Sequence, residues 1–154
     1  MKNSRAMDRI YNNEALVGCV ILMLLKDCGM DIARLSVVVP LLVNDKIRSR
    51  LSRHREESLS NNIRSCYAIL TLNRIYQEML VIEINSLVML SQADLVLIEK
   101  EIITLTDKGT DLVKNMRQVT SLRLKEIMKA QSVIMRHVNK LTTEQLYKAM
   151  EIQL

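Results

Sequence analysis

The sequence contains no tryptophan, no phenylalanine and only four tyrosines among its 154 residues. A hydrophobic core must therefore be built from aliphatic side chains and from methionine, of which there are ten. We expect most of the methionines to fill the core, although methionine-rich surfaces can also adapt to binding partners. The shortage of aromatic rings also removes the usual stacking platform for single-stranded nucleic acid.

Three further shortages argue against catalysis and metal binding. The three glycines form no phosphate-cradling loop, and the two histidines, His54 and His137, lie far apart without metal-ligand spacing, so we expect both at the surface. The three cysteines form no C-x-x-C pair, and we expect them to be buried, reduced thiols. No nucleophile or zinc-protease signature is present. We expect a protein that is not an enzyme, with no catalytic residue, cofactor or metal site.

Length and hydropathy indicate one globular, cytoplasmic protein. A chain with 49% hydrophobic and 25% charged residues can bury a core of its own without disulfides. The apolar stretch from Ala15 to Leu25 is shorter than the about 20 residues of a transmembrane helix, and we expect it to form a helix buried on nearly all sides. The polar N-terminus has no signal-peptide pattern.

The net charge of +5 comes from one segment. Five cations and no acid occupy the run 46–55: Lys46, Arg48, Arg50, Arg53 and Arg55. Removing these five from the 22 basic residues leaves 17, which equals the number of acidic residues. We expect a short helix here, anchored by Ile47 and Leu51, with its cations in solvent. The run fits three roles: a phosphate contact, a contact with an acidic partner protein, or a solvated helix face.

Capping residues and periodicity predict several helices. The first is expected from about Asn13 to Cys28, with Gly29 as its C-terminal stop. Asp31 can cap a second element, but the β-branched residues before Pro40 leave helix and strand open there. A further helix is expected from Ser58 or Ser60 to a break near Leu80, followed by a short one from Ile82 to Ser91.

The clearest strand signal lies in the second half of the chain. Two β-rich runs, Leu95–Ile98 and Ile102–Leu105, flank Glu99-Lys100-Glu101 and predict a hairpin with a charged tip. Thr106 can cap the next helix, in whose first turn Gly109 would allow close packing under the hairpin. A long helix is then expected from about 111 to 137, and a last one follows a capping box at Thr142.

Between about residues 59 and 116 the expected order of elements is helix, helix, hairpin, helix, which is the order of a winged-helix domain. The predicted fold is mainly α with a small β-hairpin, a winged-helix domain with extra N-terminal and C-terminal helices. Residues 10–116 would hold the N-terminal helices and the winged-helix domain, and residues 117–154 a C-terminal helical extension. The recognition-helix candidate, Ile82–Ser91, has Glu83 but no Lys or Arg, and the hairpin tip is net negative. Both features disfavour sequence-specific DNA reading.

The order of several short motifs resembles the middle component of the ABC-three-component systems. The opening Ile10–Leu16 is followed by Asp31–Leu35, by the apolar Val37–Val43 with its central proline, by Asp45–Arg48 and later by Leu105–Gly109. The likeness covers roughly residues 10 to 115. It departs from the family where Glu14 and Ala15 replace the Pro-Glu that many members carry.

This resemblance implies a fold and a role. It implies a helix around Pro40, and it names no catalytic residue. Members of the family are adaptor subunits encoded beside an SMC- or Rad50-like ATPase and an effector such as a nuclease, as in the Lamassu-type antiviral defence systems of bacteria. We therefore expect a non-catalytic adaptor that bridges such an ATPase and effector, with no membrane partner. Its basic run would contact either the phosphates of DNA held by the ATPase, without reading sequence, or an acidic surface of a partner protein.

Two other functions stay open. One is a winged-helix DNA-binding transcriptional regulator that dimerises through the helices after Asp111. The other is an antitoxin-like or purely structural interaction protein. The uncharged recognition-helix candidate disfavours the regulator, because base reading relies on Arg, Lys, Asn and Gln.

Overall fold

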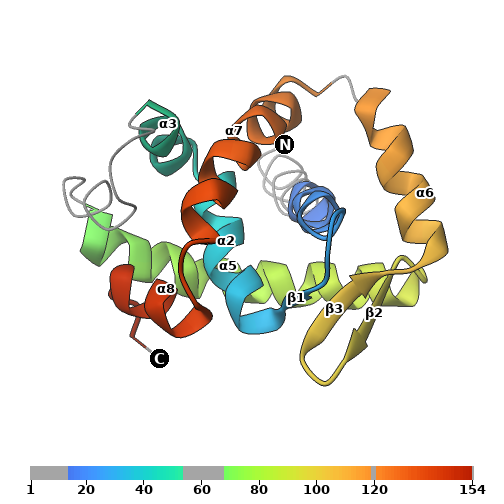
Figure 1. Cartoon of the computed structure of the whole chain (residues 1–154), viewed down its shortest axis with the longest axis horizontal. Helices are drawn as coiled ribbons and strands as arrows, with labels where there is room; N and C mark the ends of the chain where they lie inside the picture. Colours follow the sequence, from blue (N-terminus) through green and yellow to red (C-terminus); the bar gives the residue numbers. More distant parts are fainter. Residues whose placement is uncertain (1–13, 54–67, 119–120, 154) are drawn as a thin grey trace, which may run out of the picture.

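The computed structural model describes residues 14–53, 68–118 and 121–153, and it is mainly helical with one small antiparallel sheet (Figure 1). The elements in chain order are a first helix (14–24), β1 (Met30–Asp31), α2 (Ile32–Val43), α3 (Asp45–Arg53), α5 (Ala68–Gln92), β2 (Val96–Glu99), β3 (Ile102–Leu105), α6 (Asp107–Asn115), the 3-10 turn η1 (Met116–Gln118), α7 (Leu122–Val138) and α8 (Thr143–Ala149). The mainly-α class with a small hairpin is confirmed.

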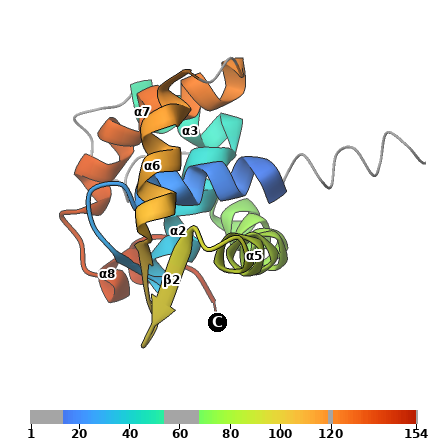
Figure 2. The same cartoon turned by 90° about the vertical axis from the view of Figure 1, so that its right-hand side faces the viewer.

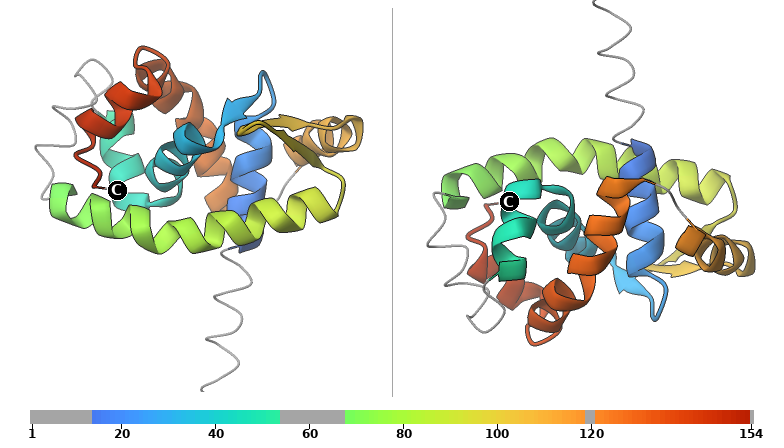
Figure 3. Two further views of the ribbon diagram at one scale, coloured as in Figure 1. Left: turned by 90° about the horizontal axis from the view of Figure 1, so that it is seen from below. Right: turned by 90° about the horizontal axis from the view of Figure 1, so that it is seen from above.

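The first helix lies inside the molecule, with α2, α5, α6 and α7 around it (Figures 1 and 3). Residues 20–25 are all buried, as the apolar stretch predicted, although the helix ends at residue 24 instead of near 28. Ile127, Ile134 and Leu146, from α7 and α8, are fully buried in the same core. The core therefore continues across residue 116, the boundary expected between domain and extension.

The segment around Pro40 is helical, which confirms the expectation drawn from the family resemblance. Asp31 caps α2, since its carboxylate accepts a hydrogen bond of 2.7 Å from the Arg34 amide. Pro40 lies inside the helix and has no N–H to donate to the carbonyl of Ser36, four residues earlier. Nine consecutive α2 residues, 35–43, are buried, so core packing outweighs the low helix propensity of the valines.

The predicted hairpin is confirmed, and it projects beyond the helices (Figure 2). Lys100 and Glu101 both take positive φ at its tip, as the two central residues of a tight turn do. A third strand, β1, pairs with β3 and gives the sheet order β1-β3-β2. Two residues are too short a strand for a sequence pattern to reveal.

Two further expected helix boundaries are wrong. No break occurs near Leu80, because α5 is one helix of 25 residues without glycine or proline, and buried positions recur along it on both sides of residue 80. Conversely, the long helix expected over 111–137 is divided between α6 and α7. Ser121 starts α7, and its hydroxyl accepts a 3.4 Å hydrogen bond from the Leu124 amide. Side-chain capping has outweighed helix propensity at this point.

Candidate functional site

The basic run divides into exposed cations and one buried cation. Lys46 and Arg53 are exposed on α3, and Arg53 donates a 2.7 Å hydrogen bond to Ser49. Arg50 is half-buried, and Arg55 lies outside the described residues. Arg48 is only 6% exposed, so the expectation that all the cations stay in solvent is wrong for it.

Arg48 is buried because it joins three helices. Its guanidinium donates to the carbonyl of Leu42 at 2.8 Å, at the C-terminal end of α2, where carbonyls have no partner within the helix. The same group pairs with Asp45 at 2.8 Å and with Glu126 of α7 at 3.6 Å. The Nε of Arg123, also on α7, lies 3.7 Å from the Asp45 carboxylate. Arg48 is therefore a structural residue that holds α3 against α7.

A second row of cations, which the sequence analysis missed, lies on α7. Lys125, Lys129 and Arg136 are all exposed, and spacings of four and seven residues place them on one stripe of the helix. The only acid of α7 is Glu126, which faces Arg48. The signal in the sequence was this helical spacing, but the residues are too widely separated to stand out as a charge run. We call Lys46, Arg53, Lys125, Lys129 and Arg136 the basic face.

Among the residues that the structure describes, the C-terminal half of α5 carries the largest group of exposed apolar side chains. Val81, Ile84, Val88 and Met89 are 64%, 57%, 48% and 51% exposed, and we call these four residues the α5 face. From residue 80 to 92 the only charged residue is Glu83, which is buried. Clustered exposed apolar side chains of this kind mark interaction sites more often than solvated surface.

An acidic residue lies next to the α5 face. Asn85 donates a 2.9 Å hydrogen bond to the carboxylate of Glu14, and Ser86 donates to the Glu14 carbonyl at 3.1 Å. These contacts hold the start of the first helix against α5. They also put a negative charge beside a surface that has no cation, which opposes the approach of a phosphate backbone.

Glu83 is the one deeply buried acid among the described residues. Only 2% of its surface is exposed, and neither carboxylate oxygen has a hydrogen-bond partner there. Burial raises its pKa to about 8. The nearby Ser36 hydroxyl opposes this shift, but it donates its own hydrogen bond to the Ile32 carbonyl at 3.0 Å. Glu83 is therefore not placed to act as a solvent-accessible catalytic acid. Its ionisation should instead make the stability of the fold depend on pH.

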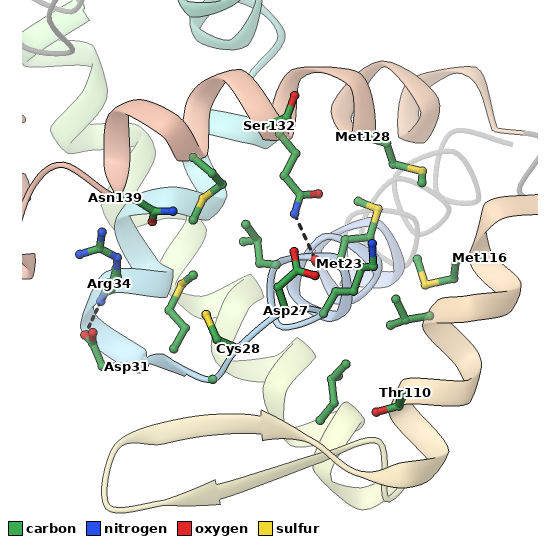
Figure 4. Close-up of a pocket in the computed structure, with 18 of the residues that line it drawn as sticks. Met23, Asp27, Cys28, Asp31, Arg34, Thr110, Met116, Met128, Ser132 and Asn139 are labelled. Carbon is green, nitrogen blue, oxygen red and sulfur yellow. Dashed lines mark hydrogen bonds between the residues drawn. The ribbon is translucent and has the colours of Figure 1, made fainter.

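A cleft of about 800 Å³ opens between the first helix, the sheet, α6 and α7. Five methionines line it, and Figure 4 shows Met23, Met116 and Met128 pointing toward one another from different elements. Methionine side chains can adapt to varied apolar groups. Cys28 is exposed at this cleft, which contradicts the expectation of buried thiols. Cys66 lies outside the described residues.

The described residues bring together no group of three His, Cys, Asp or Glu side chains that could hold a metal ion. His137 is buried, not at the surface as expected, and its Nε2 has no hydrogen-bond partner there. His54 lies outside the described residues. Within the same ranges no helix is both long and apolar enough to cross a bilayer.

Comparisons with protein-family models, with characterised proteins and with solved structures found no match to this chain. The function is therefore argued from the surfaces described above and from the motif resemblance.

Proposed function

We propose that this chain is a non-catalytic, cytoplasmic adaptor with winged-helix topology, and that it binds a partner protein through the α5 face. The observation that carries the proposal is the composition of that face. Four exposed apolar side chains and no cation occupy the surface that a winged-helix protein would turn toward DNA. Such a surface suits the apolar centre of a protein interface, where charged residues are depleted.

The order of the elements supports the winged-helix assignment in a revised form. A winged helix runs helix, strand, helix, helix, strand, strand, with its first strand beside the last. Here the first helix, β1, α2, α5, β2 and β3 follow this order, and β1 pairs with β3. In this assignment α3 is an insertion and all of α5 is the recognition-helix equivalent, in place of Ile82–Ser91 alone.

The motif resemblance supplies the identity of the partners. It implies an SMC- or Rad50-like ATPase and a nuclease-like effector in a bacterial antiviral defence complex. The α5 face would receive an apolar helix of the ATPase, since an amphipathic helix buries its apolar stripe against such a surface. The methionine-lined cleft, on another side of the first helix, is available to the second partner.

The proposal is tested by affinity purification of the tagged protein from its native host, with the co-purifying proteins identified by mass spectrometry. We expect the unaltered protein to recover a large coiled-coil ATPase together with an effector. The double variant Ile84→Asp and Val88→Asp should lose the ATPase, because it places two charges in the contact. Both positions are already exposed, so the fold should persist, as circular dichroism would check.

Leu122→Asp is the matched control, since Leu122 is 73% exposed on α7, away from α5. This variant should recover the same partners as the unaltered protein. Recovery of the protein alone, or only with itself, would remove the adaptor proposal. Recovery of the ATPase by the α5 double variant would place the docking surface elsewhere.

The alternative function is a winged-helix DNA-binding transcriptional regulator. The observation in its favour is the basic face, which gives the chain a surface of the right charge for DNA. A regulator binds a defined duplex far more tightly than unrelated sequences, by at least about 1,000-fold. Selection of a specific sequence from a random duplex pool by the isolated protein would establish this alternative.

A further inference from the structure

We propose that the basic face binds the phosphate backbone of duplex DNA without reading its sequence. This inference goes beyond the adaptor function, because docking through the α5 face requires no DNA. It also assigns DNA contact to a different surface from the recognition helix and the hairpin. Figure 3 shows α3 and α7 next to one another on the side seen from above, whereas α5 runs along another side.

The spacing of the α7 cations suits a polyanion of regular charge. With a rise of about 1.5 Å per residue, Lys125 and Arg136 lie about 16 Å apart along the helix. Duplex DNA carries one negative charge per about 1.7 Å of its axis, so a row of this length meets several phosphates. Lys46 and Arg53 add two exposed cations from α3, which packs directly on α7.

The acids on these two helices are already engaged. Asp45 pairs with Arg48 and Arg123, and Glu126 pairs with Arg48. By contrast, Lys46, Lys125, Lys129 and Arg136 have no acidic partner among the described residues. Pairing with Arg48 therefore offsets part of the negative charge at the junction of the two helices. Both carboxylates are still exposed, 66% for Asp45 and 55% for Glu126, but the five cations of the basic face outnumber them.

The chemistry of the face favours duplex DNA over other acidic partners. Neither α3 nor α7 contains an aromatic residue on which an unpaired base could stack. Ser132 lies between the cations of the α7 stripe, and the one exposed apolar side chain on that stripe is Leu122, at the start of the helix. A single exposed residue does not supply the desolvated apolar centre that a protein interface needs. Sequence-independent binding through phosphates needs only the cations.

The test measures binding of the isolated full-length protein to two fluorescent 20-base-pair duplexes of unrelated sequence, by polarisation over a range of salt concentrations. Five phosphate contacts predict a slope of log K against log salt of about −4.5, so Kd should rise about 500-fold from 50 to 200 mM salt. Both duplexes should give the same Kd. A single strand of the same length should bind more weakly.

The variant K125Q/K129Q/R136Q removes the α7 row. With two contacts left, the slope should fall to about −1.8, and the same salt change should raise Kd only about 12-fold. The matched control is K100Q/K108Q/K114Q, which removes three exposed lysines from the hairpin tip and α6. It lowers the net charge equally, and it should leave the slope unchanged.

Three results would overturn the inference. The first is that the unaltered protein does not bind DNA at 50 mM salt. The second is that it strongly prefers one of the two duplex sequences. The third is that the control with the hairpin and α6 substitutions loses binding while the α7 variant does not. Binding of an acidic protein to the basic face, with no DNA binding, belongs to the first of these. Because no ATPase or effector is present in the assay, its outcome is independent of the co-purification that tests the adaptor proposal.

Discussion

Glu83 offers a direct test of the packing between α2 and α5, because its carboxyl group is buried without a hydrogen-bond partner. Burial raises the folded-state pKa from 4.5 to about 8. Below pH 4.5 the side chain is protonated in both the folded and unfolded states and has no effect on the pH dependence. As the pH rises from 4.5 to 8, the unfolded chain ionises but the folded chain must keep its proton, so stability falls.

The size of this loss follows from the two pKa values. Each pH unit above the unfolded-state pKa lowers the free energy of unfolding by about 1.4 kcal/mol, so at pH 7 the loss is about 3 kcal/mol. Above pH 8 the cost levels off near 5 kcal/mol. Because small domains are stable by only about 5 to 15 kcal/mol, a change of this size is easily measured.

The substitution Glu83→Gln keeps the shape of the protonated side chain and removes its titration. We expect the variant to be more stable than the unaltered protein by about 3 kcal/mol at pH 7 and by little at pH 4.5. Urea denaturation at pH 4.5, 6, 7 and 8.5, followed by circular dichroism, measures the free energy of unfolding at each value. Glu78→Gln, at an exposed position of the same helix, is the control and should follow the unaltered protein.

Equal pH dependence of the unaltered protein and Glu83→Gln would refute this reasoning. It would mean that the Glu83 carboxyl reaches water or a hydrogen-bond donor in solution. Ser36 is the nearest candidate for such a donor, since its hydroxyl could turn from the Ile32 carbonyl to the carboxylate.

Two further predictions concern residues that hold the fold. Arg48→Met should lower the free energy of unfolding by about 2–3 kcal/mol, because it leaves a buried α2 carbonyl without a donor, whereas Arg53→Met at an exposed site should change it little. Thermal unfolding of both variants decides this, and equal stability would contradict the role given to Arg48. Gly109→Ala should lower the free energy of unfolding by about 3 kcal/mol, since a Cβ there would lie 2.0 Å from the Leu95 carbonyl oxygen. A Cβ at Gly18 would meet only the Leu90 side chain, at 3.8 Å, so Gly18→Ala should instead raise the free energy of unfolding by about 1 kcal/mol. An equal loss of stability in both variants would contradict the argument from the close approach at Gly109.

The burial of Arg48 changes how the basic run can be studied. Charge reversal at this residue would separate α3 from α7 as well as alter the surface. A loss of function in such a variant would therefore report the fold and not the contact. Substitutions at Lys125, Lys129 and Arg136 avoid this difficulty, because these side chains are exposed and make no ion pair with the described residues.

Local signals in the sequence were sufficient where neighbouring residues decide the outcome. The hairpin, the Thr106 cap, the close packing of Gly109 and the capping box at Thr142 all depend on residues within a few positions of each other, and all are present. The buried first helix was also readable, because an apolar run of its length has no face to offer to water.

The tertiary structure decided the features that depend on distant residues. Arg48 is buried because Glu126 and the end of α2 come to meet it, and the two-residue β1 exists because β3 pairs with it. The α7 cations form a surface with α3 only because the two helices pack together. Periodicity describes one helix at a time, so it can identify which residues share a face, but only the packing of the whole chain determines what that face meets.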